Sequence, residues 1–260
     1  MAYSVIAIAN QKGGVGKTTT AINLGAALAM NGHRTILIDL DPQGNASTGL
    51  GIGIEKRQRT VYDLLSGPDT LSDCAVQTDI ANLTIVPATP DLSSADVELS
   101  QVKDRTRLLQ RKLDHTDEDS VVLIDCPPAL GLLTVNAMVA AHSVLVPLQA
   151  EFYALEGLSQ LLSTVKQVRQ NGNPNLRVSG VLLTMSDYRN NLSQQVEADA
   201  RATLGDLVFA TVIPRNVRVS EAPSFAQPVL LYDPASKGSA AYRQFATEFA
   251  ARLKLVKEEA

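Results

Sequence analysis

The feature that most constrains the fold is a glycine-rich segment between an apolar run and a helical pattern. Val5–Ala9 is apolar and rich in β-branched residues, Asn10–Thr19 reads NQKGGVGKTT, and apolar residues then recur at helical spacing as far as Met30. Glycines allow backbone N–H groups to turn toward an anion, and the N-terminus of the following helix attracts the same negative charge. The segment therefore predicts a phosphate-binding loop between a strand and a helix.

Side chains of this loop suit a nucleotide. We expect Lys17 to reach the β- and γ-phosphates and the Thr18 hydroxyl to bind Mg²⁺. The loop departs from the usual G-x-x-x-x-G-K-[ST] pattern, because Gln11 replaces the first glycine and Lys12 follows it. A second lysine beside Lys17 would be repelled in an empty site, so its position predicts a nearby anion. The alternative for Lys12 is a solvated lysine that binds no anion. The alternative for the whole segment is a tight glycine turn that joins a strand to a helix.

Acidic residues follow two further apolar strands. The second expected strand leads into Asp39-Leu40-Asp41, and the expected strand Val121–Ile124 is followed directly by Asp125. Because the carboxyl ends of parallel strands line the ligand crevice, these carboxylates are expected beside the glycine-rich loop. One of Asp39 and Asp41 can serve the Mg²⁺ shell while the other orients or deprotonates the attacking water, and Asp125 would hold the ion directly or through water. For Asp41, which precedes a proline, turn formation is the alternative.

The rest of the chain alternates short apolar runs with longer helical patterns. This alternation predicts an α/β fold, with a mostly parallel central sheet flanked by helices on both faces and one domain spanning residues 1–260. Residues 49–73 are expected to be an irregular insertion. The expected strands are Val5–Ala9, Thr35–Ile38, Leu83–Val86, Val121–Ile124, Val144–Pro147 and Val178–Leu183, and the expected helices are Lys17–Met30, Ser93–Leu113, Leu132–Ala141, Leu155–Gln170, Leu192–Leu204 and Ser239–Val256.

Composition limits the partners and the compartment. The formal charge is −4, residues 1–150 hold 11 basic and 16 acidic side chains, and the remainder holds 12 and 11. Any nucleic-acid surface is therefore expected to be local and in the second half. The apolar start follows no basic region, and no apolar run approaches the ~20 residues that span a bilayer. Cys74 and Cys126 stand far apart, without metal-ligand spacing. We expect a cytoplasmic protein.

These motifs resemble those of the deviant-Walker ParA/MinD ATPases, and within them the ParA/Soj chromosome and plasmid partitioning proteins. The agreement extends over essentially the whole chain and is carried by residues 12–19, 39–45, 125–133, 153–157 and 213–223. The resemblance implies a P-loop NTPase-like fold and an ATP hydrolase whose weak activity is stimulated by a ParB-like centromere-binding protein. It also implies an ATP-dependent homodimer in which Lys12 crosses to the partner's phosphates, which would supply the missing anion.

The resemblance implies roles for individual residues. The catalytic residues would be Lys12, Lys17 and Asp41, with Mg²⁺ bound by Thr18, Asp39 and Asp125. The ATP-binding residues would be Lys12, Gly13, Gly14, Val15, Gly16, Lys17, Thr18, Thr19, Met185, Pro214 and Asn216, with Met185, Pro214 and Asn216 near the adenine.

Family members bind double-stranded DNA nonspecifically as ATP dimers, which implies a nucleoid-associated state. Arg189 and Arg218 match family positions that contact the DNA backbone, and Arg215, Lys237 and Arg243 are further candidates. A solvated or acid-paired arginine is the alternative, with Glu221 available to Arg218. No helix-turn-helix segment precedes the first strand, so we do not expect site-specific operator binding of the larger ParA type.

Other functions share this nucleotide site. A MinD-like ATPase would use an amphipathic C-terminal helix as a membrane anchor, and Tyr242, Phe245, Phe249, Leu253 and Val256 form such a stripe. The acidic residues Glu258-Glu259 would be repelled by anionic lipid. We therefore expect the stripe to pack on the sheet, and we do not expect membrane binding. A nitrogenase iron protein-like redox function, a scaffold with an inactive site, and a ParA-like positioner of a protein cargo are further alternatives.

Overall fold

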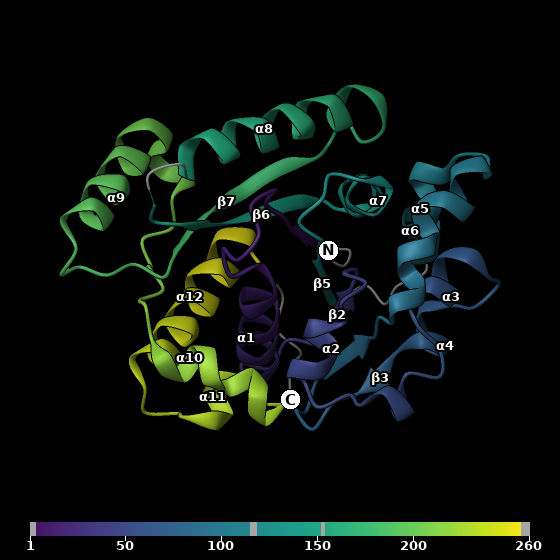
Figure 1. The fold of residues 1–260 in the computed structure, drawn as a ribbon, viewed down its shortest axis with the longest axis horizontal. Coiled ribbons are helices and arrows are strands. Elements are labelled where there is room, and N and C mark those ends of the chain that lie inside the picture. Colours follow the sequence, from purple (N-terminus) through teal and green to yellow (C-terminus); the bar gives the residue numbers. More distant parts are fainter. Residues whose placement is uncertain (1–3, 115–118, 152–153, 256–260) are drawn as a thin grey trace.

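The computed structural model describes residues 4–114, 119–151 and 154–255. One seven-stranded sheet has the strand order β3-β4-β2-β5-β1-β6-β7, and every strand pair is parallel except β3 with β4 (Figure 1). The mostly parallel α/β fold is therefore confirmed, with one short antiparallel strand at an edge. The strands are β1 Ser4–Ile8, β2 Thr35–Asp39, β3 Val76–Gln77, β4 Leu83–Val86, β5 Val121–Asp125, β6 Ser143–Gln149 and β7 Arg177–Thr184.

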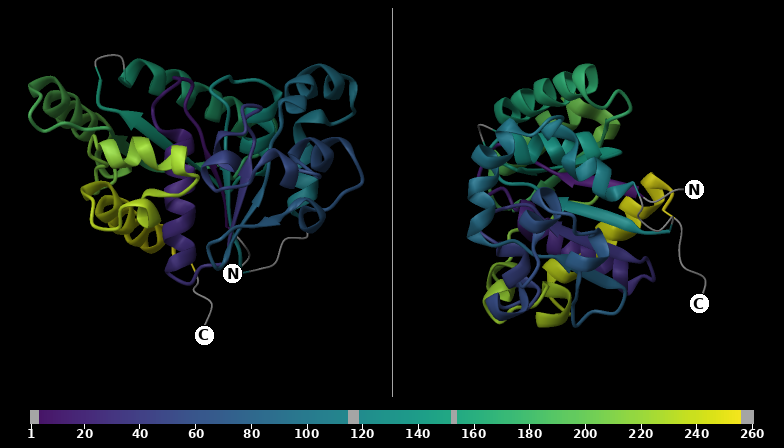
Figure 2. Two further views of the ribbon diagram at one scale, coloured as in Figure 1. Left: turned by 60° about the horizontal axis from the view of Figure 1, so that its bottom comes forward. Right: turned by 90° about the vertical axis from the view of Figure 1, so that its right-hand side faces the viewer.

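Helices cover both faces of the sheet (Figures 1 and 2). The longer helices are α1 Lys17–Met30, α7 Leu132–Ala140, α8 Ala154–Asn171, α9 Asn191–Leu204 and α12 Lys237–Leu253. The shorter ones are α2 Asn45–Gly49, α3 Val61–Ser66, α4 Leu71–Cys74, α5 Ala95–Glu98, α6 Leu108–Leu113, α10 Val217–Glu221 and α11 Val229–Tyr232.

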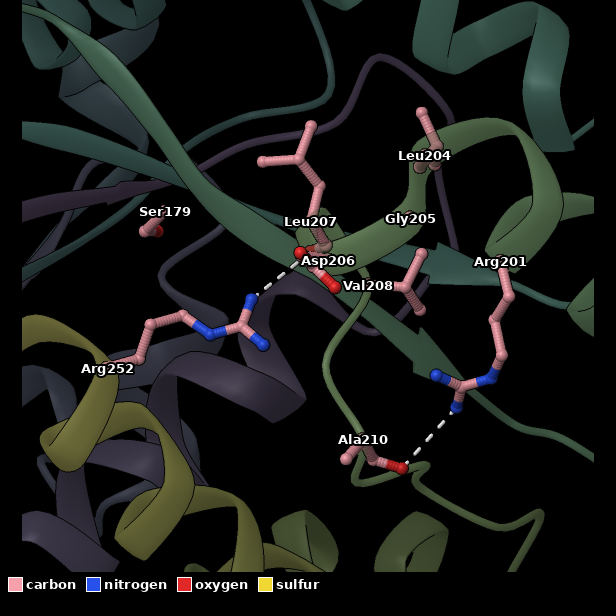
Figure 3. A pocket seen from close by; sticks show the side chains of 9 residues that line it. All are labelled: Ser179, Arg201, Leu204, Gly205, Asp206, Leu207, Val208, Ala210 and Arg252. Carbon is pink, nitrogen blue, oxygen red and sulfur yellow. Dashed lines mark hydrogen bonds between the residues drawn. The ribbon is translucent and has the colours of Figure 1, made fainter.

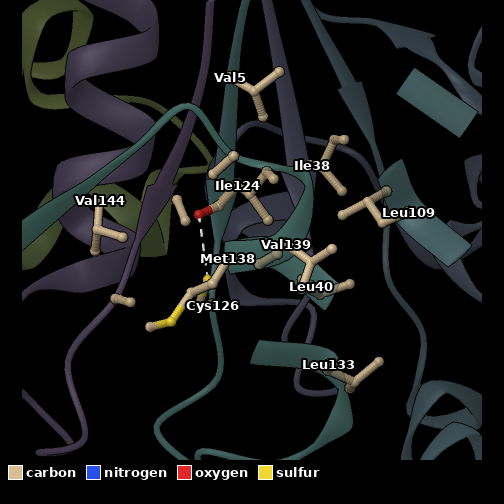
Figure 4. Packing of buried hydrophobic residues seen from close by; sticks show 14 of the residues in the cluster. Val5, Ile38, Leu40, Leu109, Ile124, Cys126, Leu133, Met138, Val139 and Val144 are labelled. Atoms are coloured by element: carbon tan, nitrogen blue, oxygen red, sulfur yellow. Dashed lines mark hydrogen bonds between the residues drawn. The ribbon is translucent and has the colours of Figure 1, made fainter. Parts of the chain in front are cut away.

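Each face of the sheet has its own hydrophobic core, because alternate side chains of a strand point to opposite faces. In β1, Val5 and Ala7 pack with α6, α7 and α8, whereas Ile6 and Ile8 pack with α1, α11 and α12. Figure 4 shows the first core, in which Ile124 of β5 lies near the α7 side chains Met138 and Val139, with Val5 of β1 on its other side. Burial on both faces explains why the central strands are almost continuously apolar.

The strand register brings three strand ends to one level. Ile8 of β1 and Asp39 of β2 are both register partners of Asp125 in β5. The loop after β1 and the acidic residues after β2 and β5 therefore start side by side. This arrangement matches the expected crevice at the carboxyl ends of parallel strands.

Two of the predicted segments differ in the structure. The expected helix over Ser93–Leu113 is broken, because Val102 is extended and Asp104 adopts a left-handed conformation with φ 56°. The expected irregular insertion over residues 49–73 instead contains α3 and most of α4. Thr60 and Thr70 begin these helices with capping boxes, each reciprocated by an aspartate three residues later.

The C-terminal helix α12 packs against the core. Tyr242, Phe245 and Phe249 are buried, and Phe209 meets Phe245 edge to face at 4.9 Å between ring centroids. Packing of the stripe on the sheet is therefore confirmed for these residues, while Val256 and Glu258-Glu259 lie outside the described residues. No helix in the described part of the chain is long and apolar enough to cross a membrane.

Candidate functional site

The glycine-rich loop leads from the end of β1 into the N-terminus of α1. Gly14 and Gly16 have φ angles of 75° and 85°, a region that residues with a Cβ rarely adopt. Gly16 caps α1 without any side-chain hydrogen bond, so the helix end is not blocked by its own cap. This conformation is the one expected of a loop that presents backbone N–H groups to an anion.

A pocket of about 280 Å³ lies over this loop. It brings together the predicted loop residues other than Lys12 and Val15 with Asp41 and Met185, which follow two other strands. Asn45 and Pro128 also line it and were not predicted as site residues, although both lie in the motifs that carry the resemblance. The lining residues are Gly13, Gly14, Gly16, Lys17, Thr18, Thr19, Asp41, Asn45, Pro128 and Met185.

Lys17 is a buried cation inside this pocket. Its side chain is 6% exposed, and its Nζ donates to the carbonyl oxygen of Lys12 at 3.2 Å. Burial lowers the pKa of Lys17, and the negative charge of Asp125 acts in the opposite direction. The Lys12 carbonyl and the charge of Asp125 compensate the buried ammonium only in part, because the pKa of Lys17 is still lowered. A phosphate in the pocket would compensate this charge further.

Asp125 lies at the end of β5, completely buried. Neither of its carboxylate oxygens makes a hydrogen bond of ordinary geometry with the described residues. Burial, followed by the charge of Asp39, raises the pKa of Asp125 well above its usual range, whereas the Thr18 hydroxyl and Lys17 lower it. A buried carboxylate with unsatisfied oxygens next to a threonine hydroxyl fits a hard cation such as Mg²⁺.

Asp39 and Asp41 have different surroundings. Asp41 lines the pocket, and its Oδ1 accepts a hydrogen bond from the Gln43 amide at 3.0 Å. Asp39 is fully buried outside the pocket lining, and its Oδ2 accepts from both the amide and the hydroxyl of Ser47, at 2.8 and 2.7 Å. Burial raises the pKa of Asp39 to about 6 despite these bonds. Asp39 therefore anchors α2 beside the pocket, and its role as a Mg²⁺ ligand stays a prediction.

Lys12 has an acidic partner within its own chain. Its Nζ lies 2.7 Å from Oε2 of Glu151, with the two side chains 40% and 48% exposed. Sequence reasoning predicted an anion for Lys12 but did not identify Glu151, which follows β6 and is distant in the sequence. Such an exposed pair contributes at most about 1 kcal/mol, so Lys12 can leave it at low cost.

The residues predicted near the adenine come from neighbouring segments. Met185 follows β7, and its Cε lies 3.5 Å from the position that a Cβ on Gly16 would take. Ser186 and Pro214 form a parallel bridge, which holds the second segment beside Met185. Asn216 caps α10, where its side chain accepts from the Arg218 amide at 2.9 Å. Pro214 and Asn216 do not line the pocket itself. Thr184, which was not predicted, fixes β7 to the loop by donating to the Val15 carbonyl at 2.9 Å.

The arginines predicted to bind DNA are exposed but paired with acids. Arg189 forms a two-pronged pair with Asp187, at 3.0 Å from Nε and 2.9 Å from Nη2. Arg218 contacts Glu221 at 3.0 Å and Asp233 at 3.3 Å, so the predicted Glu221 pairing is present. The remaining predicted DNA-binding residues, Arg215, Lys237 and Arg243, are also exposed.

A larger hollow of about 810 Å³ lies beside β7, away from the glycine-rich loop (Figure 3). Arg201 and Arg252 reach into it, but each is engaged by its own glutamate four residues earlier on its helix. Arg252 also lies over the ring of Phe209 at 3.8 Å from the centroid. Arg201 of α9 donates to the Phe209 carbonyl and Arg252 of α12 to the Leu207 carbonyl, so both arginines hold the segment after α9 in place. The lining of this hollow contains neither the glycine-rich loop nor a strand-end aspartate.

Comparisons with known proteins identify the family of the chain. A family model described as an AAA domain matches residues 3–178. The chromosome partitioning protein ParA of Caulobacter vibrioides is 57% identical over 251 residues, which cover 95% of this chain and 94% of that protein. The sporulation initiation inhibitor protein Soj of Bacillus subtilis is 50% identical over 248 residues, which cover 95% and 98%. The chain belongs to the ParA/Soj family of chromosome-partitioning ATPases.

A solved structure has the same fold as the ParA/Soj chain. The crystal structure of cobyrinic acid a,c-diamide synthase from Mycobacterium smegmatis, with bound ADP and magnesium, has a TM-score of 0.85 and 41% identity, and the match covers 97% of this chain and 96% of that one. Adenine nucleotide and magnesium are thus bound within this fold family. Like its ParA/Soj relatives, the chain is a P-loop ATPase of the partitioning type.

Proposed function

We propose that the chain binds Mg-ATP in the pocket over the glycine-rich loop, pairs into a homodimer in that state, and hydrolyses ATP. The observation that carries the proposal is a pocket lined by Lys17, Thr18 and Asp41, with the buried, unsatisfied Asp125 carboxylate interacting with Lys17 and Thr18 behind it. Thr18 and Asp125 hold Mg²⁺ in this proposal, with Asp39 as a further predicted ligand. When bound, the metal would neutralise phosphate charge that develops during hydrolysis.

The other residues have distinct tasks. Lys17 binds the β- and γ-phosphates, while Asp41, held at the pocket wall, orients the attacking water. Lys12 leaves Glu151 and completes the site of the partner subunit. Since both Lys12 and Glu151 are substantially exposed, this exchange needs no rearrangement of the core.

We further propose that the ATP dimer binds double-stranded DNA without sequence preference and segregates or positions chromosome or plasmid DNA with a ParB-type partner that stimulates hydrolysis. The names of the ParA and Soj relatives support partitioning, and the exposed arginines Arg189 and Arg218 support a DNA surface. Pairing doubles the number of basic side chains on one assembly, which would let a chain of net charge −4 bind DNA only as a dimer. The chain would then be cytoplasmic and nucleoid-associated in its ATP state.

The test is duplex binding by the purified chain with a slowly hydrolysed ATP analogue, compared with ADP. Light scattering on the same samples reports the oligomeric state. We expect a dimer and DNA binding with the analogue alone. A dimer that binds no DNA but floats with anionic liposomes would instead favour the MinD-like function, and a dimer that binds neither would favour a protein cargo.

A further inference from the structure

Two exposed arginines of the proposed DNA surface, Arg189 and Arg218, are neutralised within the chain. Arg189 is 81% exposed, yet its guanidinium makes a two-pronged pair with Asp187, and this pairing lowers the pKa of Asp187 to about 2. Arg218 is 53% exposed and lies between Glu221 and Asp233. The acids therefore occupy the donor groups that a DNA phosphate would need.

Side-chain contacts connect these residues into one surface. Lys237 at the start of α12 lies 3.4 Å from the Tyr188 hydroxyl, next to Arg189. Arg218 of α10 reaches Asp233 in the segment before α12. We define the basic surface as the exposed cations Arg189, Arg215, Arg218, Lys237 and Arg243 with the acids Asp187, Glu221 and Asp233 among them. Three of its eight charges are therefore negative.

The pairs are suited to exchange. A guanidinium fork fits a phosphate as well as a carboxylate, and ion pairs exposed to water are weak and screened by salt. A phosphate can therefore displace Asp187 from Arg189. The displaced carboxylate stays on the surface, however, where it repels the same phosphate.

We propose that Asp187 and Glu221 are built-in competitors that hold the DNA affinity of the basic surface below the value its arginines alone would give. This inference rests on the proposed function, since it concerns the same surface and the same ligand. Weak, salt-sensitive binding would let dimers dissociate and rebind along DNA rather than stay at one place.

The size of the effect follows from Coulomb's law. A unit charge on the order of 7 Å from a phosphate changes the binding constant about 2.7-fold in water before salt screening. A dimer carries each acid twice, so removing one kind of acid gives about sevenfold in the dielectric of water before salt screening. At 50 mM salt we expect a gain of about threefold to sevenfold.

The experiment compares three single variants of the full chain as dimers with a slowly hydrolysed ATP analogue. Asp187→Asn and Glu221→Gln remove one acid each and keep a side-chain oxygen as an acceptor. Asp104→Asn is the matched control, because Asp104 forms a similarly exposed pair with Arg111 at 2.8 Å, between α5 and α6 at the opposite end of the molecule from α9 and α10 (Figure 1). Each variant is checked for dimerisation before its affinity for a duplex is measured.

The expected result is a threefold to sevenfold rise for Asp187→Asn and Glu221→Gln and little change for Asp104→Asn. The double variant Asp187→Asn with Arg189→Gln should bind the duplex no more tightly than Arg189→Gln alone. The inference is overturned if the two acid variants equal the control, if they bind DNA more weakly, or if the gain survives the loss of Arg189. Absence of DNA binding by the wild-type dimer would instead overturn the proposed function.

Discussion

Replacing Lys17 by methionine should separate the stability of the fold from the affinity for nucleotide. Lys17 is almost completely buried, and burial lowers its pKa, so its ammonium form is held at a desolvation cost that Asp125 offsets only in part. Methionine has a similar length and no charge. Lys17 donates to the Lys12 carbonyl, and burial favours the neutral form of Asp125, so replacing Lys17 does not strand an ion-paired carboxylate. We therefore expect the nucleotide-free Lys17→Met variant to unfold within about 1 kcal/mol of the wild type or to be more stable.

Nucleotide binding should respond in the opposite direction. Charge-assisted hydrogen bonds contribute ~1.5–3 kcal/mol each, so losing the Lys17 ammonium should weaken ATP binding about 10- to 100-fold. At an ATP concentration of about 100 times the wild-type Kd, binding stabilises the wild type by ~2.7 kcal/mol. The same concentration would stabilise the variant by only ~0.4–1.4 kcal/mol. At about 2–4 °C per kcal/mol for a chain of this size, the ATP-induced rise in Tm should fall to about half or less.

The assay is thermal unfolding with and without Mg-ATP, for the wild type, Lys17→Met and a control, Lys166→Met. Lys166 lies exposed on α8, so its replacement should leave the ATP-induced rise unchanged. A full ATP-induced rise in Lys17→Met would refute the reasoning, because Lys17 would then not contact the phosphates.

Three further outcomes are expected. Asp41→Asn should keep ATP binding and dimerisation while hydrolysis falls by about 10²-fold or more, measured as phosphate release. Lys12→Ala should lose ATP-dependent dimerisation on size exclusion yet change Tm little, since the pair with Glu151 is exposed. Partial burial opposes ionisation of Glu248, but hydrogen bonds from the Thr211 and Ala210 segment outweigh it and lower the pKa of Glu248. Its stabilisation is therefore present above the unfolded pKa and lost as pH falls through the folded pKa, so urea unfolding should show Glu248→Gln destabilised by about 1–2 kcal/mol at pH 7 and less below about pH 4.

The sequence was sufficient for those elements whose signals are local. The helix Lys17–Met30 and the strand Leu83–Val86 have the predicted bounds, because glycine or turn residues precede each and the apolar pattern is continuous. The broken region after Pro90 was not predictable in this way. The helical pattern is interrupted at Val102 and Asp104, which are not helix-breaking residue types. The interruption therefore depends on how the short helices of this region pack against α7.

The same distinction applies to the candidate site. The loop residues, Asp41 and the strand-end Asp125 follow from motifs that are contiguous in sequence. Glu151 is 139 residues from Lys12, and no local pattern connects the two. The different surroundings of Asp39 were not predictable either. Strand alternation predicts that Asp39 and Asp41 lie on the same side, but it does not predict that Ser47 of α2 donates hydrogen bonds to Asp39.

The central claim, an ATPase site completed by Lys12 of the partner subunit, is tested most directly by mixing two inactive variants. In a dimer of Lys12→Ala with Asp41→Asn, one site has both its own Asp41 and the partner's Lys12, and the other site has neither. Random pairing would make half of the dimers mixed, so about a quarter of the wild-type rate of Mg-ATP hydrolysis is the upper limit for an equal mixture, and weaker pairing of Lys12→Ala lowers this limit. The mixture is measured at a protein concentration at which size exclusion shows mixed dimers, and mixed dimers that are no faster than the mean of the two variants measured separately would contradict the shared site.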